Sequence, residues 1–170
     1  MTKRILVSMT AAAGMALLAA LAGCGEEPRP AGAVVVPPPL NLLLPQKIRI
    51  TPFTGARAID ERGLTGLDVR IEAIDSYGDS TKAFGRFRFE LFVFQANKPD
   101  GRGERLASWS LDLENPQINR DHWNNIARCY QFKLGWSEPI AVGKQFVLVA
   151  TYESRFGGRL FDQKIFQPGQ

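Results

Sequence analysis

The chain has 170 residues, which is enough for one domain of ordinary size and not comfortably for two. Hydrophobic residues make up 45% and charged residues 22% of it, and these proportions exclude a wholly disordered chain and a polytopic membrane protein. The formal net charge is only +4, so the composition gives no reason to expect a nucleic-acid partner.

The first 23 residues have the pattern of a secretory signal peptide. Lys3 and Arg4 form a short positive region, and a mostly apolar, uncharged stretch from Ile5 to Ala20 follows. That stretch is too short and too weakly flanked to predict a stable membrane span. Removal of the segment takes Lys3 and Arg4 with it, leaving 19 basic against 17 acidic residues, a net charge of +2.

The segment ends in Leu21-Ala22-Gly23-Cys24, which resembles the lipobox of bacterial lipoproteins. The resemblance implies cleavage between Gly23 and Cys24, a thioether-linked diacylglycerol on Cys24 and an N-acyl chain on the new N-terminus. Several acyl chains, each worth about 0.8 kcal/mol per buried methylene, give stable membrane anchoring. Gly25, in place of Asp, implies sorting to the outer membrane if the envelope has one. We therefore expect an exported protein anchored to a bacterial membrane.

Residues 24–45 are expected to be a tether. Six of the 11 prolines fall between Gly25 and Pro45, which predicts a semi-rigid, extended spacer. Val34–Val36 and the leucines of Leu40–Leu44 are too apolar to remain entirely in water. They could pack on the domain, lie near the membrane surface or await a partner, and we favour packing of the leucines on the domain.

Residues 46–170 have a β pattern. Leu67, Val69, Ile71 and Ala73 alternate with polar residues, the clearest period-two run of the chain. Further apolar runs occupy 48–50, 87–94, 107–113, 130–134, 146–152 and 160–166. Such runs, separated by turns, predict an all-β antiparallel sandwich of about seven to eight strands, Ig-like or C2-like.

One short helix is expected within this domain, over residues 119–127. Asn119 is the predicted cap, and Asp121 would lie in the first turn, where a negative charge suits the helix dipole. Trp123 and Ile126, three residues apart, would then face the sheet.

Candidate catalytic groups are few. The single histidine, His122, follows Asp121, and such a pair can orient an imidazole as a general base, but a triad also needs a nucleophile. Cys129, the only thiol left once Cys24 is acylated, lies on a predicted buried strand and is expected to be a small packed residue. One histidine and one thiol cannot form a zinc site of the usual type. We expect no enzyme, metal or cofactor, and keep a hydrolase using His122 as a lesser alternative.

A calcium site is a second alternative. Asp60, Asp75 and Asp79 flank the strand at 67–73, and carboxylates on loops can bind calcium. The stretch from Gly66 to Ala73 is similar to the opening strand of a C2 domain, although the Asp-Pro-Tyr segment typical of that family is missing. A simple turn at 75–79 explains the same residues, so we favour the turn.

Candidate binding residues lie around one hairpin. Arg86, Arg88, Arg102 and Arg105 could cluster there, and Trp136 is the one tryptophan expected in a loop. Glu90 and Glu104 interleave with these arginines, so we favour a solvated sheet face over a binding site for them. We expect a non-catalytic binding or interaction module at the cell envelope with a protein or polymer partner. The alternative is a ligand-binding module for an anionic polymer, a sugar or lipid headgroups.

Overall fold

The computed structural model describes residues 34–36, 40–59, 61, 65–136 and 143–168. The predicted signal peptide, Cys24 and Asp60 lie outside these residues. The predictions that depend on them therefore stay predictions.

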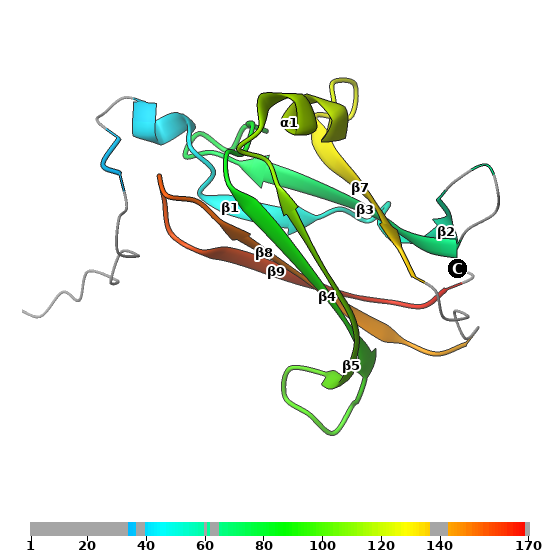
Figure 1. Cartoon of the computed structure of the whole chain (residues 1–170). Coiled ribbons are helices and arrows are strands. Elements are labelled where there is room, and N and C mark those ends of the chain that lie inside the picture. Colours follow the sequence, from blue (N-terminus) through cyan, green and yellow to red (C-terminus); the bar gives the residue numbers. More distant parts are fainter. Residues whose placement is uncertain (1–33, 37–39, 60, 62–64, 137–142, 169–170) are drawn as a thin grey trace, which may run out of the picture.

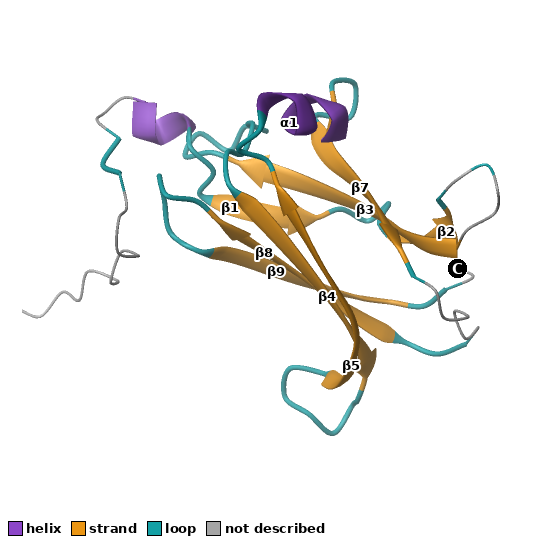
Figure 2. Ribbon diagram, in the orientation of Figure 1, coloured by secondary structure: helices purple, strands orange, loops and turns teal. Residues whose placement is uncertain are grey.

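Two antiparallel sheets pack face to face as a sandwich (Figures 1 and 2). The first, sheet A, contains β1 (Lys47–Ile50), β2 (Gly55–Ala58), β3 (Thr65–Ile74), β6 (Trp123–Asn124) and β7 (Cys129–Gly135). The second, sheet B, has the order β5 (Arg102–Asp112), β4 (Arg86–Phe94), β8 (Phe146–Glu153) and β9 (Leu160–Phe166). The predicted antiparallel sandwich is confirmed, with five and four strands among the described residues.

The alternating runs fill the core between the two sheets. On β3, Leu67, Val69 and Ile71 are fully buried, and on β4 Phe87 and Phe89 are fully buried opposite them. Because side chains alternate across a strand, the intervening charged residues of both strands face outward. Each sheet therefore has one outer face on which polar and apolar residues can meet solvent or a partner.

One edge strand of sheet A is broken into β1 and β2. Both pair with β3, at 71–74 and at 65–68 respectively, and Pro52 lies at the break, where it has no N–H to donate. The Thr54 hydroxyl takes the place of a backbone partner: it accepts from the Arg70 N–H at 2.9 Å and donates to the Arg70 carbonyl at 3.2 Å. Because of this break, the edge contains two strands, β1 and β2, where the sequence predicted only one.

Two tyrosines hold the connection that crosses from sheet A to sheet B. The Tyr130 hydroxyl on β7 accepts from the Ala83 N–H at 2.9 Å, and the Tyr152 hydroxyl on β8 accepts from the Phe84 N–H at 3.1 Å. Burial raises the pKa of Tyr130 to about 12, and burial also raises the pKa of Tyr152. One hydroxyl from each sheet thus fixes consecutive residues of the crossover.

The helix lies earlier than the sequence predicted. The helix α1 is Pro116–His122, and its cap is Asn115, whose Oδ1 accepts from the N–H groups of Gln117 and Ile118. Pro116 explains the shift, because its fixed φ suits the first helical position. Asn119 lies inside the helix, where its amide donates to the Ala83 and Leu113 carbonyls.

The two residues expected on the sheet-facing side of that helix have different positions. Trp123 begins β6 and packs edge-on against Tyr130, with ring centroids 5.0 Å apart. Ile126 lies in the turn between β6 and β7 and is 98% exposed. The prediction that Ile126 packs on the sheet was wrong, because the helix ends before it.

The described residues of the predicted tether, 34–36 and 40–45, lie along the domain. The Val34 N–H donates to the Arg155 carbonyl at 2.8 Å, and the short 3-10 helix η1 (Leu40–Leu43) precedes β1. Leu42 and Leu44 are half-buried, whereas Leu40 and Leu43 are exposed. The expected packing of the leucines is therefore correct for alternate residues only. A cleft of about 370 Å³ separates Val34–Val36 and η1 from the turn at 156–158.

Candidate interaction surface

The outer face of sheet B carries the predicted arginines. Arg86, Arg88, Glu90 and Phe92 are successive outward residues of β4, because Phe87, Phe89 and Leu91 between them are buried. The register pairs Phe92 with Arg105 of β5. The antiparallel sheet therefore brings Arg86, Arg88 and Arg105 onto one face, as a single basic hairpin would require.

Most of these arginines are matched with acidic or amide groups. Arg105 pairs with Glu90 at 3.0 Å, and Arg86 lies 3.9 Å from Asp112. The Arg88 side chain is exposed, and its guanidinium has no hydrogen bond or ion pair with any other described residue. The face is thus only weakly basic, with Arg88 as its available guanidinium.

Arg102 extends the face toward the opposite edge of the sheet. Its Nη2 donates to the Gln163 side chain on β9 at 2.7 Å, and its guanidinium lies 6.0 Å from the centre of the Phe92 ring. The register of β4 and β5 shifts beside Phe92, and such a bulge re-aims the side chains around it. The Arg102 side chain therefore spans sheet B from β5 to β9.

Apolar side chains adjoin these polar groups on the same face. Phe161 and Ile165 of the edge strand β9 are 71% and 47% exposed. The register places Thr151 beside Phe161 and Val147 beside Ile165, and both of these β8 residues are buried. We call this set the sheet B patch: Arg88, Arg105, Phe92, Phe161 and Ile165. Aromatic residues and arginine beside apolar surface are the composition enriched at protein interfaces.

Trp136 does not belong to this patch. Its side chain is 7% exposed and stacks edge-on against Phe146, with ring centroids 5.7 Å apart. The prediction that Trp136 is an exposed binding residue was wrong. The residue directly follows β7, and the strand continues its inward alternation from Leu134 to Trp136. Sequence reasoning did not name Phe161 and Ile165 as binding residues, although their alternation with Asp162 and Lys164 places them on one face of β9.

The residues considered for catalysis do not form a triad among the described residues. The His122 ring packs on Phe132, with centroids 5.0 Å apart, and its Nδ1 lies 3.0 Å from the Gln131 carbonyl, to which it can only donate. Asp121 instead accepts from the Gln117 side chain at 2.7 Å. No described hydroxyl or thiol is hydrogen-bonded to the imidazole.

Cys129 is a buried free thiol on the outer row of β7, and its expected packing is confirmed. Burial raises the pKa of this thiol, and the nearby Arg70 opposes that effect. A raised pKa keeps the group as the thiol, the less nucleophilic form, near neutral pH.

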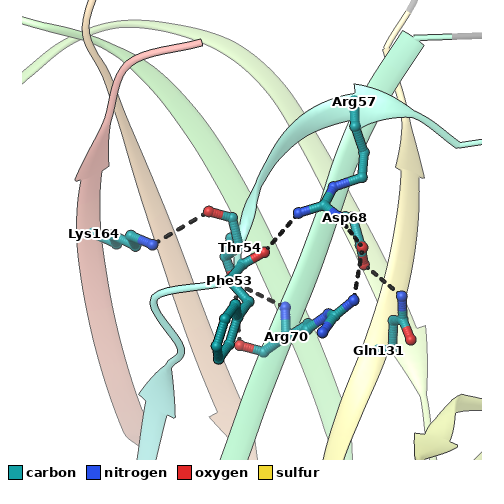
Figure 3. A network of polar contacts seen from close by, with 7 residues as sticks. All are labelled: Phe53, Thr54, Arg57, Asp68, Arg70, Gln131 and Lys164. Atoms are coloured by element: carbon teal, nitrogen blue, oxygen red, sulfur yellow. Dashed lines mark hydrogen bonds and ion pairs between the residues drawn. The ribbon is translucent and has the colours of Figure 1, made fainter. Parts of the chain in front are cut away.

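A polar network occupies the outer face of sheet A (Figure 3). The buried Asp68 carboxylate accepts from the Gln131 amide at 2.9 Å and lies 3.5 Å from both Arg57 and Arg70. Lys164 reaches across from β9 and donates to the carbonyls of the β1–β2 break, and burial lowers the pKa of its ammonium. Most of these groups bind one another, although Arg70 Nε is buried without a hydrogen-bond partner among the described residues. The network therefore supports the fold.

The carboxylates considered for calcium form a turn instead. Asp75 Oδ1 accepts from the backbone N–H groups of Tyr77 at 2.9 Å and Asp79 at 3.1 Å. Asp60 lies outside the described residues. Within the described ranges, no group of three or more His, Cys, Asp or Glu residues could hold a metal ion. A search of the same residues for an apolar helix long enough to cross a bilayer finds none.

The fold therefore defines an all-β sandwich protein with a mixed aromatic and arginine patch on one sheet. Comparisons with models of known protein families, with curated proteins and with solved structures give no match to this chain.

Proposed function

We propose that the protein is an exported, lipid-anchored β-sandwich that binds a protein partner of the cell envelope through the sheet B patch. The observation that carries this proposal is the exposure of Phe161 and Ile165 beside Arg88 on one sheet face. Exposed apolar side chains rimmed by polar groups mark interaction sites, and arginine and aromatic residues supply most interface hot spots. The lipobox-like Leu21–Cys24 segment supports the membrane anchor.

A protein partner fits the patch better than an anionic polymer does. A polymer site needs a run of arginines available to phosphate or carboxylate groups, whereas Arg105 is paired with Glu90 and Arg102 is bound to Gln163. Arg88 remains to give one charged contact within an otherwise apolar and neutral surface. The ligand-binding alternative is therefore the lesser proposal.

Site-specific photo-crosslinking in intact cells tests the partner. A photoreactive amino acid replaces Phe161 in the full chain, and a matched variant carries it at Lys133, an exposed residue on the outer face of sheet A. We expect a discrete protein adduct from position 161 and a weaker one from position 133. Arg88→Ala is expected to lower the yield at position 161 several-fold. Equal adducts from both positions, or adducts with polysaccharide alone, would contradict the proposal.

Metabolic labelling tests the anchor independently. A palmitate analogue is expected to label the wild-type protein and not Cys24→Ala. Unchanged labelling of Cys24→Ala would overturn the lipid anchor while leaving the crosslinking result to stand on its own.

A further inference from the structure

Exposed apolar side chains gather at one end of the sandwich. This is the end at which β1, β4, β7 and β9 begin and where η1 and α1 lie (Figure 1). We call it the entry end. Of ten exposed large hydrophobic residues among those described, seven are on its loops and short helices, and we call them the apolar collar: Val34, Val35, Leu40, Leu43, Tyr77, Ile118 and Ile126. Of the other three, Phe161 lies near the start of β9 on the outer face of sheet B, and Phe53 and Ile165 lie farther from this end.

Rigid turns hold two of these side chains away from the domain. Asn124 Oδ1 accepts from the N–H groups of Ile126 at 3.0 Å and Ala127 at 2.9 Å, and Ile126 is almost fully exposed at the tip. Asp75 fixes the turn that exposes Tyr77 in the same manner. Such side-chain-capped turns are locally stable, so the exposure of these residues is built into the fold.

Hydrogen bonds join the separate loops of the collar. The Thr81 hydroxyl donates to the Leu43 carbonyl at 2.9 Å, and the Ser76 N–H donates to the Leu42 carbonyl at 3.1 Å. On the other side, the Arg128 guanidinium donates to the Ser80 carbonyl at 3.1 Å. The segment 76–81 thus links η1 to the turn that carries Ile126, so Leu43, Tyr77 and Ile126 are on loops that hydrogen bonds hold together.

Charge does not select the occupant of this surface. The described residues of the entry end contain seven basic and six acidic groups: Lys47, Lys82, Arg86, Arg120, Arg128, Arg155 and Arg159, against Asp75, Asp79, Asp112, Glu114, Asp121 and Glu153. Arg86 lies near Asp112, and Arg159 pairs with Glu153 at 3.2 Å. The charges of the entry end nearly cancel, so they select neither an anionic nor a cationic partner for the apolar collar.

The position of the collar relative to the predicted lipid anchor indicates that its environment is the bilayer. Positions 24 and 34 are ten residues apart, and ten residues span at most about 36 Å. Val34 is itself tied to the domain through the Arg155 carbonyl. A lipid on Cys24 would consequently keep Val34, and the entry end to which it is bound, within about 36 Å of the bilayer.

We propose that the apolar collar inserts into the interfacial region of the bilayer that holds the lipidated Cys24, which fixes the orientation of the domain. This inference rests on the proposed lipid anchor. Leucine, isoleucine and valine side chains bury in the boundary between headgroups and acyl chains, and tyrosine is favoured at the same depth. The sheet B patch then faces sideways along the membrane, open to a neighbouring envelope protein.

Fluorescence quenching in reconstituted vesicles tests the contact. The full-length lipidated protein is labelled with an environment-sensitive dye at Leu43→Cys or Ile126→Cys. Ile165→Cys, toward the opposite end of β9, is the control, and its exposure of 47% is close to the 52% of Leu43. The native thiol of Cys129 is buried and does not compete for the dye. Vesicles of phosphatidylethanolamine and phosphatidylglycerol carry a nitroxide on the acyl chain. We expect several-fold stronger quenching at positions 43 and 126 than at position 165.

Flotation separates the failure of the anchor from the failure of the contact. Protein that does not float with the vesicles overturns both the anchor and the contact. Protein that floats but is quenched equally at positions 43, 126 and 165 overturns only the contact between the collar and the bilayer. Because charges balance at the entry end, we expect the same quenching pattern with phosphatidylcholine alone.

Discussion

At the scale of single residues, Asp68 shows how a carboxylate can be buried on the outside of a sandwich. Its side chain is 6% exposed, and two guanidiniums and one amide surround it. A buried charge is tolerated when partners satisfy it and becomes costly when one partner is removed. Asp68 and Arg70, on the outer face of β3, therefore stabilise the fold and are not simply solvated charges.

We expect Asp68→Ala to lower the free energy of unfolding by about 1–3 kcal/mol, because the half-buried Arg70 loses its counter-charge. Glu90→Ala is the matched control, since it also removes a carboxylate from an arginine pair, but Arg105 in that pair is 60% exposed. Its cost should be about 0–1 kcal/mol. Denaturant unfolding measures both, and equal midpoints would contradict the structural role of Asp68.

At the scale of elements, Lys164 closes the break between β1 and β2. Its ammonium donates to the Thr51, Pro52 and Thr54 carbonyls at 3.1, 2.7 and 3.2 Å. These carbonyls have no ladder partner at the break, and unsatisfied backbone groups are costly when shielded from water. Asp162, two residues earlier on β9, accepts from the Ile50 N–H at 2.7 Å. The two inward polar residues of β9 thus join the edges of the two sheets.

Lys164→Met keeps the length and apolar stem of this side chain and removes its donors. We expect a loss of about 1–3 kcal/mol in unfolding free energy, and faster amide hydrogen exchange at residues 50–54. Lys133→Met, at an exposed position on β7, should change neither measurement appreciably. Unaltered exchange at the break in Lys164→Met would show that water replaces the ammonium without cost.

At the scale of the whole molecule, side chains close both open sides of the sandwich and tie its crossover. Trp109 of β5 donates to the Gly135 carbonyl at 2.9 Å on one side, and β9 joins β1 on the other. Tyr130 and Tyr152 hold the crossover between the sheets. Ionisation of these two hydroxyls would remove the protons that Tyr130 donates to Asn119 and that Tyr152 donates to Phe84.

Alkaline pH should therefore unfold the protein through its buried tyrosines. The folded pKa of Tyr130 is about 12, above its ordinary value of 10.0, so its contribution is complete below pH 10 and is lost as the pH rises through 12. Two pH units correspond to about 2.7 kcal/mol. Denaturation midpoints should fall over this range, together with the appearance of tyrosinate absorbance.

Tyr130→Phe is the control for that pH dependence. We expect it to be less stable at neutral pH by about 1 kcal/mol, because the bonds to Ala83 and Asn119 are lost. Its stability should then fall less steeply above pH 10 than that of the wild type. Parallel curves would show that Tyr130 does not govern the alkaline transition.

The alternation of apolar residues in the sequence was sufficient to predict the sandwich and most of its strands. Alternation reports which face of a strand is buried, and this is a local property. The runs around Leu67, Phe87 and Val147 therefore became strands as expected. The shared face of Arg86, Arg88 and Arg105 followed from the same alternation and from the short hairpin.

The helix and Trp136 were misplaced because their positions depend on competition with neighbouring elements. Pro116 and Asn115 start the helix earlier than Asn119 would, and the Asn119 amide is used instead to hold the Ala83 carbonyl in the crossover. Trp136 is buried because Phe146, ten positions later, packs against it. The alternation of Tyr130, Phe132 and Leu134 could have placed Trp136 inward, but the contacts of Asn119 with the crossover and of Trp136 with Phe146 are not visible in the local sequence.

The sequence by itself determined the β-sandwich class and the inward rows of the core, because hydrophobic periodicity is a property of neighbouring residues. A short motif in it also predicts a lipid anchor. Only the tertiary structure decided which apolar residues stay exposed. Ile126, Tyr77 and Leu43 are far apart in the chain, and they meet at one end because Ser80 and Thr81 bind the loops on either side. Long-range hydrogen bonds and sheet register created both the collar and the sheet B patch.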